Sequence, residues 1–291
     1  MFEGTHTALV TPFRDGEIDE PALRALISEQ IDAGIDGLVP CGSTGESATM
    51  NHAEHQRAIE ITVEEAAGRA KVIAGTGSNN TSEAASLTAF AASAGADGAL
   101  LISPYYNKPT QRGHILHYQA VAAAADIPLI VYNIPGRTGV NMTPETIAEM
   151  ARTPNIVGVK EASGSLDQVS EIVRLTDDDF EVLSGDDSLT LPMMAVGAKG
   201  VISVVTNLIP ARFAEMVKLA AAGDFAGARE IHFEVLPLLK ALFTETNPIP
   251  VKAAMAMLGK MGEEVRLPLT QITDANRANL RDALVAAGLL G

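Results

Sequence analysis

The chain has 291 residues, of which 47% are hydrophobic and 20% charged, and its formal net charge is −15. A chain of this length is long for one domain but normal for an α/β barrel. The acidic balance argues against nucleic acid and anionic membranes as partners, and a single cysteine, Cys41, excludes an intrachain disulfide framework.

Residues 1–6 have neither a basic start nor a long apolar segment, so no secretory signal is visible. No apolar run approaches the ~20 residues needed to span a bilayer. We therefore expect a soluble protein of the cytoplasm. The acidic composition also leaves open an adaptation to high salt, with an ordinary soluble surface as the simpler interpretation.

Short apolar runs alternate with helical patterns through most of the chain. The predicted strands cover residues 8–10, 37–40, 71–75, 98–102, 128–132, 156–161, 180–185 and 200–204. The predicted helices that follow them include 22–33, 51–67, 82–95, 111–125, a helix that starts at 143–145, and 187–196. Strands that alternate with helices indicate parallel βαβ units, and eight such units predict an α/β fold, the (β/α)8 TIM barrel.

The chain continues as helices after the eighth strand, over residues 212–222, 225–243, 250–258 and 274–287. No linker rich in glycine, proline or serine separates this part from the rest. We therefore expect a catalytic barrel over residues 1–224 and a C-terminal helical extension, residues 225–291, packed on the barrel.

The run 156–161 ends in a lysine, Lys160, after apolar and β-branched residues that are typical of a buried parallel strand. An ammonium group beside a dry core is poorly solvated, so its pKa should fall and some free amine should exist near neutral pH. A free amine beside a cavity can attack a carbonyl and form a Schiff base. The competing interpretation is a strand-end lysine that reaches into water.

Polar residues also stand at the ends of other predicted strands, and in a TIM barrel these ends meet at one rim, where catalytic groups lie. A lysine nucleophile, a tyrosine proton carrier and hydroxyl relays form a coherent set for Schiff-base chemistry. The rim residues besides Lys160 are Ser43, Thr44, Tyr105, Tyr106, Tyr132, Ser184, Gly185 and Ser203.

A set of short motifs spread over the chain makes this interpretation specific. The motifs are Gly42-Ser43-Thr44-Gly45-Glu46, Ser103-Pro104-Tyr105-Tyr106, Tyr132-Asn133-Ile134-Pro135, Arg137-Thr138-Gly139, Gly158-Val159-Lys160-Glu161-Ala162, Leu183-Ser184-Gly185-Asp186-Asp187 and Asn247-Pro248-Ile249-Pro250-Val251-Lys252. With them the sequence resembles, over essentially its whole length, the dihydrodipicolinate synthase (4-hydroxy-tetrahydrodipicolinate synthase) family. That family lies within the pyruvate-dependent class I aldolase superfamily, which includes N-acetylneuraminate lyase.

The resemblance implies a lyase that condenses pyruvate with L-aspartate 4-semialdehyde in lysine and diaminopimelate biosynthesis, without a cofactor other than the covalent imine. Lys160 would form the imine with pyruvate, and Tyr132 would move protons as the imine becomes an enamine. Ser43 and Tyr106 would complete the proton relay, with Tyr106 lent by a neighbouring subunit. A homotetramer built from two dimers is therefore expected.

The resemblance also assigns substrate contacts. Thr44 and the backbone at Ile202 would hold the pyruvate carboxylate, Arg137 would bind the carboxylate of the second substrate, and Gly185 belongs to the substrate-binding set. Position 43 is usually threonine in this family, and serine lacks the methyl group that fixes the rotamer, so the relay here is expected to be looser.

Two pairs of histidines, His52 with His55 and His114 with His117, do not form the zinc-protease pattern, so we expect no metal site. The family gives the first pair another role, in the set that binds the inhibitor lysine in feedback-sensitive members; surface helix residues are the competing interpretation. The matching residues are Ser47, Ala48, His52, His55, Asn79, Glu83 and Tyr105.

Three alternatives remain open from the sequence. Two are other pyruvate-dependent aldolases, an N-acetylneuraminate lyase or a 2-keto-3-deoxy-sugar-acid lyase, which would need hydroxyl-binding residues near Arg137 rather than an arginine. The third is a non-catalytic barrel that senses a metabolite, against which the presence of both Lys160 and Tyr132 argues. Sequence gives neither the aldehyde nor the response to lysine.

Overall fold

The computed structural model describes residues 1–291, and its centre is a closed barrel of eight parallel strands. Neighbouring strands pair in chain order, and the last strand pairs with the first, which closes the barrel. The prediction of a TIM barrel is thereby confirmed. The strands are β1 (Gly4–Ala8), β4 (Gly37–Val39), β5 (Lys71–Gly75), β6 (Gly98–Ile102), β7 (Leu129–Asn133), β8 (Ile156–Glu161), β9 (Glu181–Ser184) and β10 (Gly200–Ser203).

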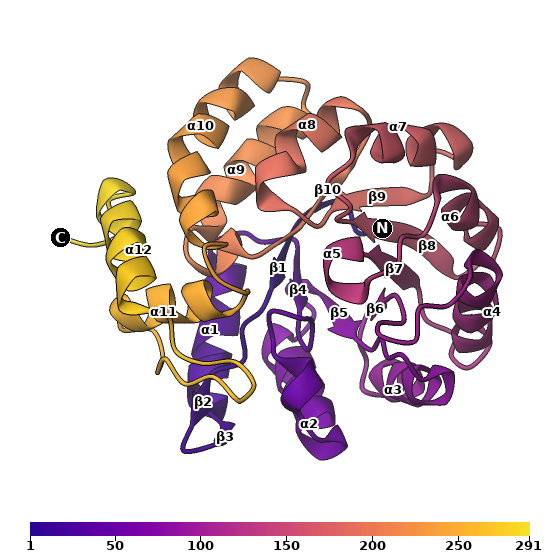
Figure 1. Cartoon of the computed structure of the whole chain (residues 1–291), viewed down its shortest axis with the longest axis horizontal. Coiled ribbons are helices and arrows are strands. Elements are labelled where there is room, and N and C mark those ends of the chain that lie inside the picture. Colours follow the sequence, from indigo (N-terminus) through magenta and orange to yellow (C-terminus); the bar gives the residue numbers. More distant parts are fainter.

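Helices surround the barrel, as Figure 1 shows. Many begin at a polar residue whose side chain accepts a hydrogen bond from the first turn; Asn51, for example, forms a capping box with Glu54 at the start of α2. The helices of the barrel are α1 (Glu20–Asp32), α2 (His52–Ala66), α3 (Thr81–Ser93), α4 (Gln111–Ala122), α5 (Pro135–Thr138), α6 (Pro144–Met150), α7 (Leu166–Leu175), α8 (Thr190–Ala195) and α9 (Pro210–Ala221). Short 3₁₀ turns are η1 (Ser47–Thr49), η2 (Asp187–Leu189) and η3 (Val205–Asn207).

Three helices follow the barrel: α10 (Phe225–Ala241), α11 (Ile249–Met257) and α12 (Asp274–Ala286). In Figure 1 they lie along one side of the barrel, with the C-terminus beyond α12. Helix α10 packs on α9, and α12 packs on both α10 and α11. The boundary between residues 224 and 225 stays a prediction. No helix is both long enough and apolar enough to cross a membrane.

The first strand was predicted wrongly, at 8–10 instead of Gly4–Ala8. Its residues Thr5, His6 and Thr7 are polar yet completely buried, so the apolar signal begins only where the strand ends. The sequence also gave no sign of the small hairpin of β2 (Phe13–Arg14) and β3 (Glu17–Ile18), or of the one-turn helix α5.

Two hydrophobic layers hold the barrel together. A cluster of 55 buried residues includes the side chains that the strands and helices pack against each other. A smaller cluster of nine includes Ile73, Ile130, Tyr132, Leu183 and Ile202, which come from four of the strands. Because the strands other than β1 are largely apolar on both faces, they form continuous hydrophobic runs in the sequence. Tyr132 belongs to the smaller cluster, so its phenol ring is packed among apolar side chains.

Candidate active site

Lys160 occupies the carboxyl end of β8, and only 6% of its surface is exposed. The residue pairs in register with Tyr132 on β7 and with Leu183 on β9. Its Nζ lies 4.3 Å from the centroid of the Tyr132 ring. No carboxylate lies within 4.0 Å of this amine, so the amine is buried without an ion-pair partner.

Burial lowers the pKa of the Lys160 amine from 10.5 to about 8. The charge of Asp187 opposes this shift, and the guanidinium of Arg137 adds to it. An ammonium group in a dry site loses its hydration, so the neutral amine becomes the favoured form at lower pH than usual. An appreciable fraction of Lys160 is therefore a free nucleophile near neutral pH.

Tyr132 is the neighbour best placed to exchange protons with a group on Lys160. It is 6% exposed, and burial raises the pKa of its phenol well above the usual value. The charge of Arg137 lowers that pKa, whereas those of Asp186 and Glu161 raise it. The phenol therefore keeps its proton in the resting site and can donate it to a developing negative charge.

The loop after β4 brings two hydroxyl groups to the same rim. Thr44 is buried, and its Oγ1 accepts a hydrogen bond from Asn247 Nδ2 at 2.9 Å, which leaves the hydroxyl hydrogen free to bind an anion. The Ser43 side chain makes no hydrogen bond and lies on a cavity wall. The backbone oxygen of Asn247 also accepts a hydrogen bond from Arg137 Nη2 at 2.9 Å, so Asn247 links this loop to α5.

Gly185 follows β9 and leaves room for the stem of Lys160. A Cβ atom at position 185 would lie 3.0 Å from Lys160 Cε and 2.8 Å from Ala162 Cβ. Ile202, on β10, is buried in the cluster that contains Tyr132. Ser184 and Ser203 from the predicted rim set bond to loop backbone instead, Ser184 to Asp186 O and Ser203 to Thr206 N.

Two cavities open beside this centre. The first has a volume of ≈ 410 Å³, and its wall includes Ser43, Tyr132, Arg137 and Asn247. The second, of ≈ 400 Å³, is lined by Ile134, Ala162, Gly185, Asp186, Ser188, Leu239, Lys240 and Phe243. Lys160, Thr44 and Ile202 are on neither wall, because they lie deeper.

The two adjacent tyrosines differ in environment. Tyr105 is 37% exposed and lines the first cavity, whereas Tyr106 is 89% exposed and contributes to neither cavity. Tyr106 has a φ of 70°, so the backbone is not extended there. Within one chain, the structure does not bring Tyr106 to Lys160.

Most of the predicted lysine-binding set lines the first cavity as well: Ser47, Ala48, His52, His55, Glu83 and Tyr105. His52 Nε2 lies 2.8 Å from Glu83 Oε1, and Glu83 also accepts a hydrogen bond from Ser78. Asn79 is not on the wall, but its Nδ2 donates to the backbone oxygen of Tyr105 at 3.3 Å. Most of the predicted regulatory residues thus share a cavity with Ser43, Tyr132 and Arg137.

The structure adds residues to which the sequence assigned no role. Asp187 accepts hydrogen bonds from the backbone of Val204 and Val205 at the end of β10, and burial raises its pKa to about 6. Glu46 and Lys252 form an ion pair of 2.5 Å with no side-chain exposure on either partner. Glu46 and Lys252 each belong to one of the sequence motifs, but the sequence contains no signal that two residues 206 positions apart form an ion pair.

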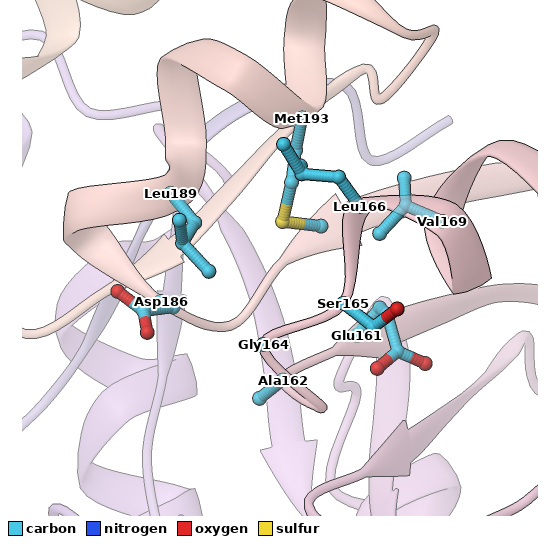
Figure 2. A pocket seen from close by; sticks show the side chains of 9 residues that line it. All are labelled: Glu161, Ala162, Gly164, Ser165, Leu166, Val169, Asp186, Leu189 and Met193. Atoms are coloured by element: carbon cyan, nitrogen blue, oxygen red, sulfur yellow. The ribbon is translucent and has the colours of Figure 1, made fainter.

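The hollow between the β8–α7 and β9–α8 connections contains no cavity for a ligand. Figure 2 shows Leu166, Val169, Leu189 and Met193 gathered over it, with Glu161 and Asp186 at its edges. Its enclosed volume is ≈ 0 Å³. Glu161 is held there by Asn133, Ser163 and Gln168, so it acts as a structural anchor for these loops.

Comparison with known proteins gives consistent matches along the entire chain. The model of the Dihydrodipicolinate synthetase family matches residues 1–287. The 4-hydroxy-tetrahydrodipicolinate synthase of Syntrophus aciditrophicus (strain SB) is 56% identical over 291 residues, which is 100% of both chains. The crystal structure of dihydrodipicolinate synthase from Aquifex aeolicus matches with a TM-score of 0.98 and 52% identity over 99% of both chains. DHDPS from Cyanidioschyzon merolae, solved with lysine bound, matches with a TM-score of 0.97 and 44% identity over 99% of both chains.

Proposed function

The chain belongs to the Dihydrodipicolinate synthetase family, and we propose that it condenses pyruvate with L-aspartate 4-semialdehyde through an imine on Lys160. The product is 4-hydroxy-tetrahydrodipicolinate, an intermediate of lysine and diaminopimelate biosynthesis. The observation that carries the proposal is the unpaired, buried amine of Lys160 beside Tyr132. The full-length relatives bear the name of this activity, which does not favour the two sugar-acid lyases or a sensing barrel.

The first half of the reaction uses the free amine. Lys160 Nζ adds to C2 of pyruvate, and loss of water gives a protonated imine. Thr44, with its free hydroxyl hydrogen, and the backbone at Ile202 would hold the pyruvate carboxylate. The positive imine then draws electrons from C3, so a C3 proton leaves and an enamine forms.

The second half joins the two substrates. C3 of the enamine attacks the aldehyde carbon, and the aldehyde oxygen takes up a proton from the relay of Tyr132, Ser43 and the Tyr106 of a neighbouring subunit. The planar guanidinium of Arg137 would hold the second substrate's carboxylate. The substrate's own amino group then attacks C2, which closes the ring and releases Lys160 as an amine. No further cofactor is needed for these steps.

Reduction with borohydride tests this proposal directly. Hydride adds to an imine carbon and fixes pyruvate on the protein as a stable secondary amine. We expect peptide mass spectrometry to find the added mass at Lys160 and not at Lys252, the other deeply buried lysine. An assay with a panel of aldehydes should then show the highest turnover with L-aspartate 4-semialdehyde. Modification elsewhere, or faster turnover of a sugar aldehyde, would contradict the proposal.

We also propose that the active protein is a homotetramer of two dimers. Tyr106 supports this, because its side chain is exposed and away from the site of its own chain. Light scattering at assay concentration measures the oligomeric state. Tyr106→Phe should lower turnover without changing the oligomeric state. A monomer with full activity would contradict the borrowed role of Tyr106. A cytoplasmic location belongs to the same proposal, in line with biosynthetic relatives.

We propose that lysine binds in the first cavity and inhibits the enzyme. The acidic and imidazole side chains of this cavity, Glu83, His52 and His55, would bind the ammonium groups of the amino acid beside Tyr132. The lysine-bound relative from Cyanidioschyzon merolae supports this assignment. We expect inhibition by millimolar lysine and its loss in Glu83→Gln. Full activity of the unaltered protein in lysine would refute the assignment.

A further inference from the structure

The second cavity carries two charged side chains that the mechanism above does not use. Asp186 belongs to the connection after β9, and Lys240 stands near the end of α10. Neither side chain forms an ion pair within 4.0 Å. Asp186 Oδ1 accepts hydrogen bonds only from the backbone and hydroxyl of Ser188, at 2.9 and 2.8 Å, and Lys240 Nζ has no hydrogen-bond partner. One carboxylate and one ammonium group thus line the same cavity unpaired.

The floor of this cavity lies against the reactive lysine. Gly185 and Ala162 line it, and the vacant Cβ position of Gly185 is 3.0 Å from Lys160 Cε. Asp186 follows Gly185 directly and is half-buried, whereas Lys240 is exposed. The negative charge is therefore the less exposed of the two and adjoins the glycine that packs on Lys160, and the positive charge is at the solvent-exposed rim.

Asp186 and Asp187 are adjacent but lie in different surroundings. Asp187 is buried and accepts hydrogen bonds from the backbone after β10. Figure 2 shows the Asp186 carboxylate at the edge of the apolar hollow, directed away from Glu161. Asp186 also acts on the phenol of Tyr132 with the opposite sign to Arg137. The charge of Asp186 therefore acts on the phenol that we propose transfers protons in the reaction.

We propose that the second cavity is the subsite for the zwitterionic head group of the aldehyde substrate, with Asp186 binding its ammonium group and Lys240 attracting its carboxylate from the rim. This inference rests on the proposed function and deepens it. Ile134 lines this cavity and immediately precedes α5, whose Arg137 lines the first cavity, so Arg137 would approach the same carboxylate from the side of the first cavity. Asp186 then selects an α-amino aldehyde over one that lacks the amino group.

The inference can be tested with two aldehydes that differ only in the amino group, L-aspartate 4-semialdehyde and succinate semialdehyde. Aldehyde consumption is measured at saturating pyruvate. Asp186→Asn keeps the acceptor for Ser188 but removes the charge. We expect kcat/KM for the amino aldehyde to fall roughly 10- to 100-fold, and that for succinate semialdehyde to fall less than about 3-fold.

A matched control is Asp179→Asn, because Asp179 is exposed, forms no side-chain hydrogen bond or ion pair and precedes the opposite end of β9. It should change neither value. Lys240→Met should lower kcat/KM a few-fold for both aldehydes, since both carry a carboxylate, and the loss should shrink as salt is added. Borohydride trapping of pyruvate at unaltered yield shows that each variant is folded with an intact amine.

The outcomes separate the inference from the proposed function. Equal losses on both aldehydes, or none, in Asp186→Asn would overturn the inference while condensation of the amino aldehyde by the unaltered protein stands. If borohydride fixes pyruvate on the unaltered protein but neither aldehyde is consumed, the proposed function is wrong. The proposed subsite is then wrong as well. A selective loss on the amino aldehyde alone supports both.

Discussion

Lys160 and Lys252 are both deeply buried, and burial lowers the pKa of both, yet their surroundings differ in one decisive respect. Lys252 pairs with Glu46 at 2.5 Å and donates to the backbone oxygen of Thr11 at 2.9 Å. Lys160 has no such partner and faces an aromatic ring. Burial alone therefore does not make a lysine a nucleophile, because a carboxylate in contact keeps the amine protonated and held in place.

The two lysines are connected through one loop. Its Ser43 and Thr44 belong to the proposed reactive centre, while Glu46, in the left-handed region with a φ of 56°, forms an ion pair with Lys252. Glu46 Oε2 also accepts a hydrogen bond from the backbone of Arg266 at 3.0 Å. Lys252 on α11 and the backbone of Arg266 thus hold the loop that we propose contacts pyruvate, so the role of Lys252 is structural.

The largest effect is expected from Lys160→Met, which keeps the length of the side chain but cannot form an imine. Turnover should fall by on the order of 10⁴ or more. The protein should also become more stable. In the folded state the Lys160 amine has a pKa of about 8 rather than 10.5, so burying its charge costs roughly 3 kcal/mol below pH 8. That cost fades as pH rises through 8 toward 10.5.

Thermal unfolding at neutral pH, together with the activity assay, checks both halves of this prediction. The stabilisation should disappear when unfolding is measured near pH 10, where the unaltered protein carries a neutral amine. Residual turnover close to that of the unaltered protein would remove Lys160 from the mechanism. A variant that is less stable at neutral pH would show that the amine is not buried as a charge.

The opposite pattern is expected at the second lysine. Lys252→Met leaves the Glu46 carboxylate buried without its cation, and Glu46→Gln leaves the ammonium group without its anion. Each should lower the free energy of unfolding by about 3–5 kcal/mol, and the double variant should lose less than the sum. Urea unfolding measures these values. Additive losses would mean that the two groups do not act as a pair.

The exposed pair of Arg152 and Glu149, at 2.9 Å, serves as the control for this series. Glu149→Gln should cost at most about 1 kcal/mol, because surface ion pairs are weak. Pyruvate trapping at Lys160 should persist in every variant of the second lysine that remains folded. Complete loss of pyruvate trapping in a folded Glu46→Gln protein would contradict the claim that Lys252 has only a structural role.

The pH dependence of imine formation sharpens the comparison further. With a pKa of about 8, the free-amine fraction of Lys160 rises about tenfold from about pH 7 to about pH 9 and then levels off. The rate of borohydride-trapped imine at low pyruvate should follow that curve. A midpoint near 10.5 would instead describe a lysine in water, which the competing interpretation of the sequence predicted.

The difference between the two lysines also shows what the sequence could predict. Lys160 was found because an apolar, β-branched run leads into it, and such a run is a local signal of burial. Lys252 and Glu46 carry no such signal, since each is an ordinary polar residue until the fold brings them together across 206 positions. Asp186 and Lys240 likewise carry no local signal in the sequence, because only the fold brings them to the wall of the same cavity.

Strand prediction succeeded and failed for the same physical reason. Seven strands are apolar on both faces, as parallel barrel strands are, and the sequence located them. The first strand buries Thr5, His6 and Thr7, and the hydrogen bond that Thr7 donates to Gln30 joins residues that lie outside one local sequence pattern. Polar residues that are satisfied by distant partners cannot be recognised from local hydrophobicity.

The smallest effect is expected at Ser43, on the reactive side of the shared loop. Ser43→Thr adds a methyl group that restricts χ1 and should hold the hydroxyl more firmly toward Tyr132, so kcat should rise about two- to fivefold. The pH midpoint set by Lys160 should not move, because no charge changes. Ser170→Thr, on the exposed face of α7, is the matched control and should leave kcat unchanged. A lower kcat in Ser43→Thr would mean that the serine is fitted to this site as it stands, and that a mobile hydroxyl serves the relay better than a fixed one.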